Sequence, residues 1–90
     1  MAMIEPLRHY ERAFESTLFL RKGDYKLAEK MLNDIVGYLE NETSSNKTYT
    51  RLYCQYILAE LDGDLDGKRA IRREAISLKC SKGLKLSLPL

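Results

Sequence analysis

The sequence has no tryptophan, one histidine and two cysteines among its 90 residues, and these shortages exclude several kinds of site. The single histidine, His9, cannot build a histidine-based metal cluster, and no GxSxG motif accompanies it. Cys54 and Cys80 stand far apart and outside any CxxC motif, so neither a zinc site nor a disulfide framework is indicated. We therefore expect a protein that is not an enzyme and uses no cofactor or metal.

Long apolar runs are also lacking. The longest uncharged stretch is far shorter than the ~20 residues of a membrane-spanning helix, and Glu5, Arg8 and Glu11 place charges near the amino terminus. With 44% hydrophobic and 31% charged residues, the chain is too apolar for disorder and too charged for a membrane span. We expect a cytoplasmic protein without membrane contact, with one helical domain over residues 1–82 and an extended or frayed tail at 83–90.

Acidic residues are scarce in the last part of the chain. Residues 1–66 carry 8 basic and 12 acidic side chains, whereas residues 67–90 carry 7 basic and 1 acidic side chain. Such asymmetry is typical of a surface for an acidic partner, although a basic last helix also complements its own dipole. RNA binding through this segment is one alternative function. Because the tyrosines lie mostly outside the segment, nucleic acid is a less favoured partner than protein.

Four stretches with helical periodicity cover most of the chain, and they predict an all-α fold. A helix from about Glu5 to Lys22 is expected to end at Gly23, and two more are expected at about 47–61 and 66–82. The clearest stretch precedes the polar loop at 41–46. Its apolar residues follow the spacing of one helix face: Ala28, Met31, Leu32, Ile35, Val36 and Leu39. Gly37 inside this stretch predicts the close approach of a neighbouring helix.

An internal repeat relates the two halves of the chain. Residues 22–32, KGDYKLAEKML, align with residues 62–72, DGDLDGKRAIR, so that Gly23 corresponds to Gly63. The repeat predicts two antiparallel helical hairpins in tandem.

The stretch Asp62–Gly67 also has the aspartate spacing of the first half of a calcium loop. However, Arg73 falls where such a loop needs a glutamate, so a turn that caps the last helix is favoured over calcium binding.

The first copy resembles a tetratricopeptide repeat. Gly23 stands at the turn between the helices, Tyr25 follows it, and Ala28 is the small residue where paired helices cross. The chain departs from the repeat at Arg12, where a large apolar residue is usual, and at Glu40, which replaces the closing proline. The resemblance implies a divergent, tetratricopeptide-like stack.

Within that group the chain is similar to the small co-chaperones of type III secretion needle subunits. The similarity lies in the turn RKGDY at residues 21–25 and in the aromatic helix LYCQYILAEL at residues 52–61. Membership implies that the protein binds a helix of an aggregation-prone secreted subunit together with a second small chaperone.

The first and third helices have more apolar residues than one core-facing stripe requires. Phe14 and Leu18 are expected to face the core, and other apolar residues of these helices are expected to be free for a partner helix. The resemblance implies six partner-binding positions on the concave side of the stack: Tyr10, Ala13, Thr17, Leu20, Tyr53 and Ile57. Two alternatives are that the core takes all six, and that the protein is a homodimer that buries the same surface.

Overall fold

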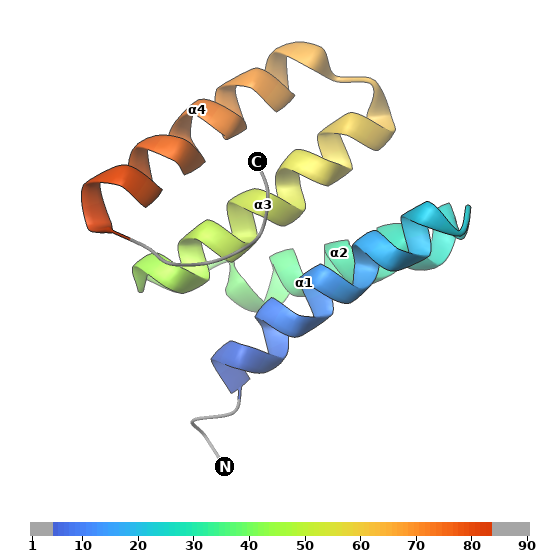
Figure 1. Cartoon of the computed structure of the whole chain (residues 1–90), viewed down its shortest axis with the longest axis horizontal. Helices are drawn as coiled ribbons and strands as arrows, with labels where there is room; N and C mark the ends of the chain where they lie inside the picture. Colours follow the sequence, from blue (N-terminus) through green and yellow to red (C-terminus); the bar gives the residue numbers. More distant parts are fainter. Residues whose placement is uncertain (1–4, 84–90) are drawn as a thin grey trace.

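The computed structural model describes residues 5–83, with side chains from residue 11 onward, as four helices. They are α1 (Glu5–Arg21), α2 (Tyr25–Leu39), α3 (Ser45–Asp62) and α4 (Leu65–Lys82). Figure 1 shows two antiparallel hairpins side by side, with α1 and α2 in one and α3 and α4 in the other. The predicted all-α fold of two tandem hairpins is confirmed.

The two hairpin turns have the same hydrogen bonds at repeat-related positions. In the first turn, Gly23 N–H donates to Leu20 O at 3.1 Å and Asp24 N–H donates to Phe19 O at 2.9 Å. In the second turn, the amide N–H groups of residues 63 and 64 donate to the carbonyl oxygens of residues 60 and 59 at 3.2 and 2.9 Å. Both glycines have positive φ, 86° and 74°, which a residue with a Cβ rarely adopts. The repeat is therefore present in the backbone as well as in the sequence.

Asp64 caps α4. Its carboxylate Oδ1 accepts a hydrogen bond of 3.0 Å from the N–H of Gly67, which satisfies one of the unpaired donors of the first turn. Because α4 already begins at Leu65, Asp66 and Gly67 are helical, and Asp62–Gly67 has the conformation of a capped helix start and not of a calcium loop. Among the described residues no group of three His, Cys, Asp or Glu side chains could hold a metal ion.

The core is built around α3, which contacts each of the other three described helices, whereas α4 contacts α3 alone. Side chains on almost every side of α3 are consequently buried. The core cluster draws on all four helices: Ala13, Leu32, Ile35, Leu39, Tyr49, Leu52, Tyr53, Cys54, Ile57 and Ala75. No described helix is both long enough and apolar enough to cross a membrane.

The expectation for Gly37 is wrong, and the predicted tail at 83–90 lies mostly outside the described residues. Gly37 lies on the exposed side of α2, and a Cβ built there meets nothing within 4 Å, so the expected close approach of a neighbouring helix is wrong. The predicted tail begins at Gly83, which is the left-handed C-cap of α4 with φ 62°, and its remaining residues lie outside the described part of the chain.

Candidate protein-binding surfaces

Three of the six predicted partner-binding positions belong to the core. Ala13, Tyr53 and Ile57 have exposed fractions of 0%, 1% and 9%, so these side chains offer a partner almost no surface in this monomer. Burial also raises the pKa of the Tyr53 phenol to about 12. Leu20 is partly buried against the same cluster. The side chain of Tyr10 lies outside the described residues.

Thr17 completes the predicted set and is half-buried on α1. Its Oγ1 donates a hydrogen bond of 2.6 Å to the carbonyl oxygen of Phe14, one turn earlier. The structure thus brings Ala13, Thr17 and Leu20 together on one side of α1, as the repeat register implied. That side mainly faces the core.

The surface that α1 leaves uncovered is the stripe predicted to be buried. Phe14 and Leu18 lie one turn apart and are 49% and 41% exposed, so their assignment to the core was wrong. The physical reason is the size of the residues at the helix crossing. Ala13 and Ser16 are both fully buried, and the Ser16 hydroxyl satisfies itself by donating to Ala13 O at 2.6 Å. Small residues let α1 approach its neighbours closely, and the larger side chains turn outward.

The repeat relates these two half-exposed side chains to covered positions on α3. Gly23 and Gly63 are equivalent, so Phe14 corresponds to Cys54 and Leu18 corresponds to Leu58. Cys54 is fully buried and Leu58 is packed against the core. Burial also raises the pKa of the Cys54 thiol to about 12.

The covered positions on α3 face the first hairpin. Leu52 and Tyr56 line pockets together with residues of α4, so this side of α3 faces α4. Cys54 is two residues from each of them, a rotation of about 200° around a helix. It therefore faces away from α4, toward the hairpin of α1 and α2. Among the described helices α1 contacts only α2 and α3, and neither covers the corresponding side of α1 fully; we call this half-exposed hydrophobic side, with Phe14 and Leu18, the α1 end.

On α4 two positions that are apolar and buried in the first hairpin have charged residues instead. Leu32 and Leu39 of α2 are buried, and their equivalents on α4 are Arg72 and Lys79. Arg72 is exposed, and Lys79 Nζ lies 5.8 Å from the centroid of the Tyr49 ring. A polar outer face is what terminal units of helical stacks require for solubility. Among the described residues, α4 therefore has charged side chains at these two outer positions, whereas α1 has Phe14 and Leu18 half-exposed on its outer side.

A basic stripe runs along α4. Arg69, Arg72 and Arg73 line a shallow pocket together with Ile76, and within the described chain none of these arginines has a carboxylate partner. Lys68 differs from them. Its Nζ lies 3.2 Å from Glu60 Oε1 and 5.2 Å from the centroid of the Tyr56 ring.

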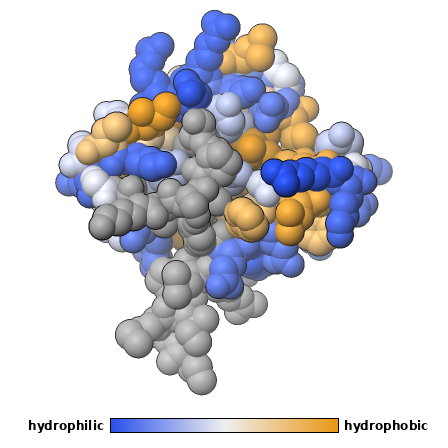
Figure 2. Space-filling model, in the orientation of Figure 1, coloured by the Kyte–Doolittle hydropathy of each residue, from blue (hydrophilic) through white to orange (hydrophobic). Residues whose placement is uncertain are grey.

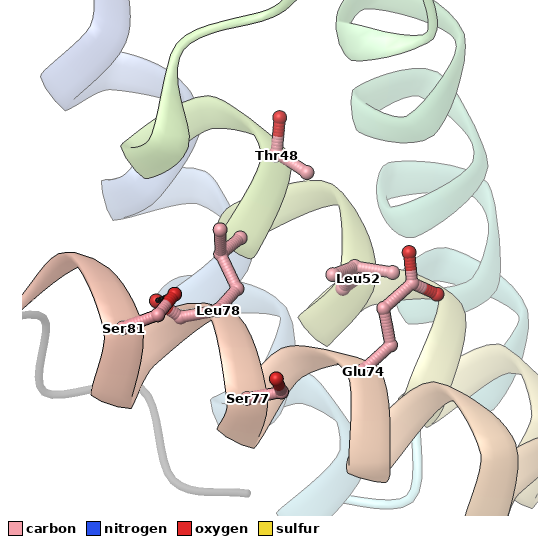
Figure 3. A pocket seen from close by; sticks show the side chains of 6 residues that line it. All are labelled: Thr48, Leu52, Glu74, Ser77, Leu78 and Ser81. Atoms are coloured by element: carbon pink, nitrogen blue, oxygen red, sulfur yellow. Dashed lines mark hydrogen bonds between the residues drawn. The ribbon is translucent and has the colours of Figure 1, made fainter.

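A further pocket lies between the first half of α3 and the second half of α4, and Figure 3 shows it from close by. Leu52 and Leu78 lie in the seam between the two helices, and Leu78 reaches toward α3. The remaining lining residues are one carboxylate and three hydroxyls: Thr48, Glu74, Ser77 and Ser81. These side chains form an aliphatic seam with a polar rim.

Hydrophobic surface is also visible on the face in Figure 2, where it gathers over the carboxyl-terminal halves of α1 and α3 between hydrophilic side chains. Sequence reasoning missed the α1 end, although the small residue Ser16, which is buried on the other side of α1, was a signal for it.

No protein-family model, curated protein or solved structure matches this chain.

Proposed function

We propose that this chain is a non-enzymatic protein-binding module that holds an amphipathic helix at the α1 end. The observation that carries the proposal is the exposure of Phe14 and Leu18 at positions whose equivalents in the second hairpin are covered by other helices. A surface that receives helices at one place in a repeat has the shape to receive a helix at the equivalent place.

The side chains at the α1 end determine which kind of partner helix can bind there. Phe14 and Leu18 lie at i and i+4 on one helix face, which is the spacing that meets the apolar stripe of an amphipathic helix. Charged residues, Glu11 and Arg21, flank the pair along the same face. The partner helix therefore has an apolar stripe about two turns long with charges of both signs beside it.

The predicted concave positions have a smaller part in this proposal. Thr17 is partly exposed beside the α1 end and extends its edge. Leu20 packs against the core on the other side of α1, and Ala13, Tyr53 and Ile57 hold the helices together beneath the surface. The proposal thus keeps α1 as the binding helix and moves the contact around its circumference.

A narrower proposal is that the partner is a needle-type subunit of a type III secretion system, bound in the cytoplasm with a second small chaperone. Its support is the turn at residues 21–25 together with the aromatic helix at residues 52–61, as in the similarity given above. The all-α hairpin stack is compatible with that group.

The test is site-directed photocrosslinking followed by direct binding. A benzophenone amino acid at position 18 is expected to crosslink to a helical segment of a partner, and the same amino acid at Ile76 of α4 serves as the control. A synthetic peptide of that segment should then bind the wild-type protein, and Leu18→Asp should weaken binding tenfold or more, on the order of 1.4 kcal/mol. Equal affinity for the wild type and Leu18→Asp would refute the proposal.

A further inference from the structure

The exposed face of α1 has a charge pattern that is complementary to itself. Glu11, Phe14, Leu18 and Arg21 follow the spacing i, i+3, i+7 and i+10, so they lie on one face of the helix. Within the described chain neither Glu11 nor Arg21 forms an ion pair. The stripe therefore has an acidic end, two apolar residues in the middle and a basic end.

This stripe is symmetric about Ser16. Phe14 and Leu18 are each two residues from Ser16, or about 3 Å along the axis, and Glu11 and Arg21 are each five residues from it, or about 7.5 Å. If the exposed sides of two α1 helices cross in antiparallel orientation at the axial level of Ser16, whose own side chain faces the core, Phe14 of one copy meets Leu18 of the other. Glu11 of one copy then meets Arg21 of the other, and this pairing occurs twice.

We propose that the helix held at the α1 end is α1 of a second copy of this chain, which docks antiparallel around a two-fold axis that passes between Phe14 and Leu18. The inference rests on the proposed function, because it uses the same surface and names its occupant. A two-fold contact is made by the same patch on both copies, so it requires a patch that complements itself. A parallel pairing lacks this property, because it sets Glu11 against Glu11 and Arg21 against Arg21.

The basic face of α4 is a poorer site for a second copy. The basic stripe of α4 would bring Arg69, Arg72 and Arg73 of the two copies together, and like charges at close range oppose association. The small size of the domain also favours a contact that covers Phe14 and Leu18, because a chain of 90 residues buries a limited share of its own apolar surface.

Charge reversal in the full chain tests this inference, with sedimentation equilibrium from about 1 to 200 µM as the measurement. We expect a concentration-dependent dimer for the wild type. Glu11→Arg and Arg21→Glu should each raise the dimer dissociation constant roughly tenfold or more, because each change sets two like-charge pairs across the axis. The double variant that combines both changes restores two opposite-charge pairs and should return the constant to within about threefold of the wild type.

Two further variants separate the interface from the fold. Leu18→Asp should give a monomer with an unchanged helical circular dichroism spectrum, whereas Ile76→Asp, a matched change on α4, should leave the dimer intact. A wild-type monomer at all concentrations would overturn the inference, and so would a double variant as weak as the single ones. In either case the proposed function would still hold if a crosslinked partner peptide binds the wild type and its binding is weakened by Leu18→Asp. A dimer that excludes every peptide would overturn the function proposed for foreign helices.

Discussion

Aspartate placed at two repeat-equivalent positions, one half-exposed and one buried, tests which of the two belongs to the core. Phe14→Asp and Cys54→Asp place a carboxylate at positions that are 49% and 0% exposed. A buried aspartate at pH 7 is neutral only if its pKa rises by about 3 from its ordinary value of ~3.9, which costs about 4 kcal/mol. Burying the neutral carboxyl without hydrogen-bond partners costs a further ~1–3 kcal/mol. The total stability of a domain this size is only about 5 kcal/mol, so Cys54→Asp should be largely unfolded at pH 7.

Phe14→Asp should be far milder. About half of the ring is buried, so the change forfeits about half of the ~3 kcal/mol that full burial of a phenylalanine provides, and the new carboxylate reaches water. We expect a loss of about 1–2 kcal/mol in the free energy of unfolding. Urea denaturation followed by circular dichroism at both positions measures the difference.

The pH dependence provides an internal control for this pair. In Cys54→Asp the folded-state pKa of the new carboxyl is raised above its unfolded value, so the folded state binds more protons between about pH 4 and pH 7. Stability then falls as the pH rises, and the variant should regain structure near pH 4. Phe14→Asp should show no such recovery. If both variants lose the same free energy at pH 7, Phe14 is a core residue and the account of the α1 end is wrong.

Other outcomes are expected from single positions. At pH 8 a thiol reagent should label Cys80, which is exposed. It should label buried Cys54 roughly a thousandfold more slowly than an ordinary thiol, because a pKa of about 12 leaves little thiolate. Similar rates for the two cysteines would contradict the burial of Cys54. Gly37→Ala should raise the free energy of unfolding by about 0.5–1 kcal/mol, and Gly63→Ala should lower it because φ there is 74°; urea titration distinguishes these signs. Single-stranded RNA should bind only weakly at 150 mM salt by fluorescence anisotropy, and tight binding that Arg72→Glu abolishes would instead favour the nucleic-acid alternative.

The sequence was most informative where local chemistry decides the structure. The apolar spacing of Ala28, Leu32 and Ile35 predicted the buried face of α2, and the equivalence of Gly23 and Gly63 predicted two turns that have the same hydrogen bonds. Helix ends were also close to expectation, because glycine caps and an aspartate N-cap act within a few residues of themselves.

The orientation of α1 could not be predicted in the same way. This helix has two apolar stripes, one with Phe14 and Leu18 and one with Ala13 and Leu20, and hydrophobicity alone favours the larger residues for the core. Which stripe is buried depends on how closely the neighbouring helices approach, and that is a property of the assembled fold. The buried hydroxyl of Ser16 is inexpensive because it finds a backbone carbonyl on its own helix, and this made the small-residue stripe the better seam.

The attachment of α4 to α3 alone has a consequence for the order in which the molecule opens. Detaching α4 breaks its contact with α3 alone, and Ala75 is the one described residue of α4 that is fully buried, whereas α3 buries seven. Partial unfolding in native conditions should therefore begin with α4, and its backbone amides should exchange with deuterium earlier than those of α3. In this partially unfolded state α1, α2 and α3 stay assembled, and Leu52 and Tyr56 of α3 become exposed. The state therefore exposes an aromatic and an aliphatic side chain on the side of the molecule opposite the proposed binding site.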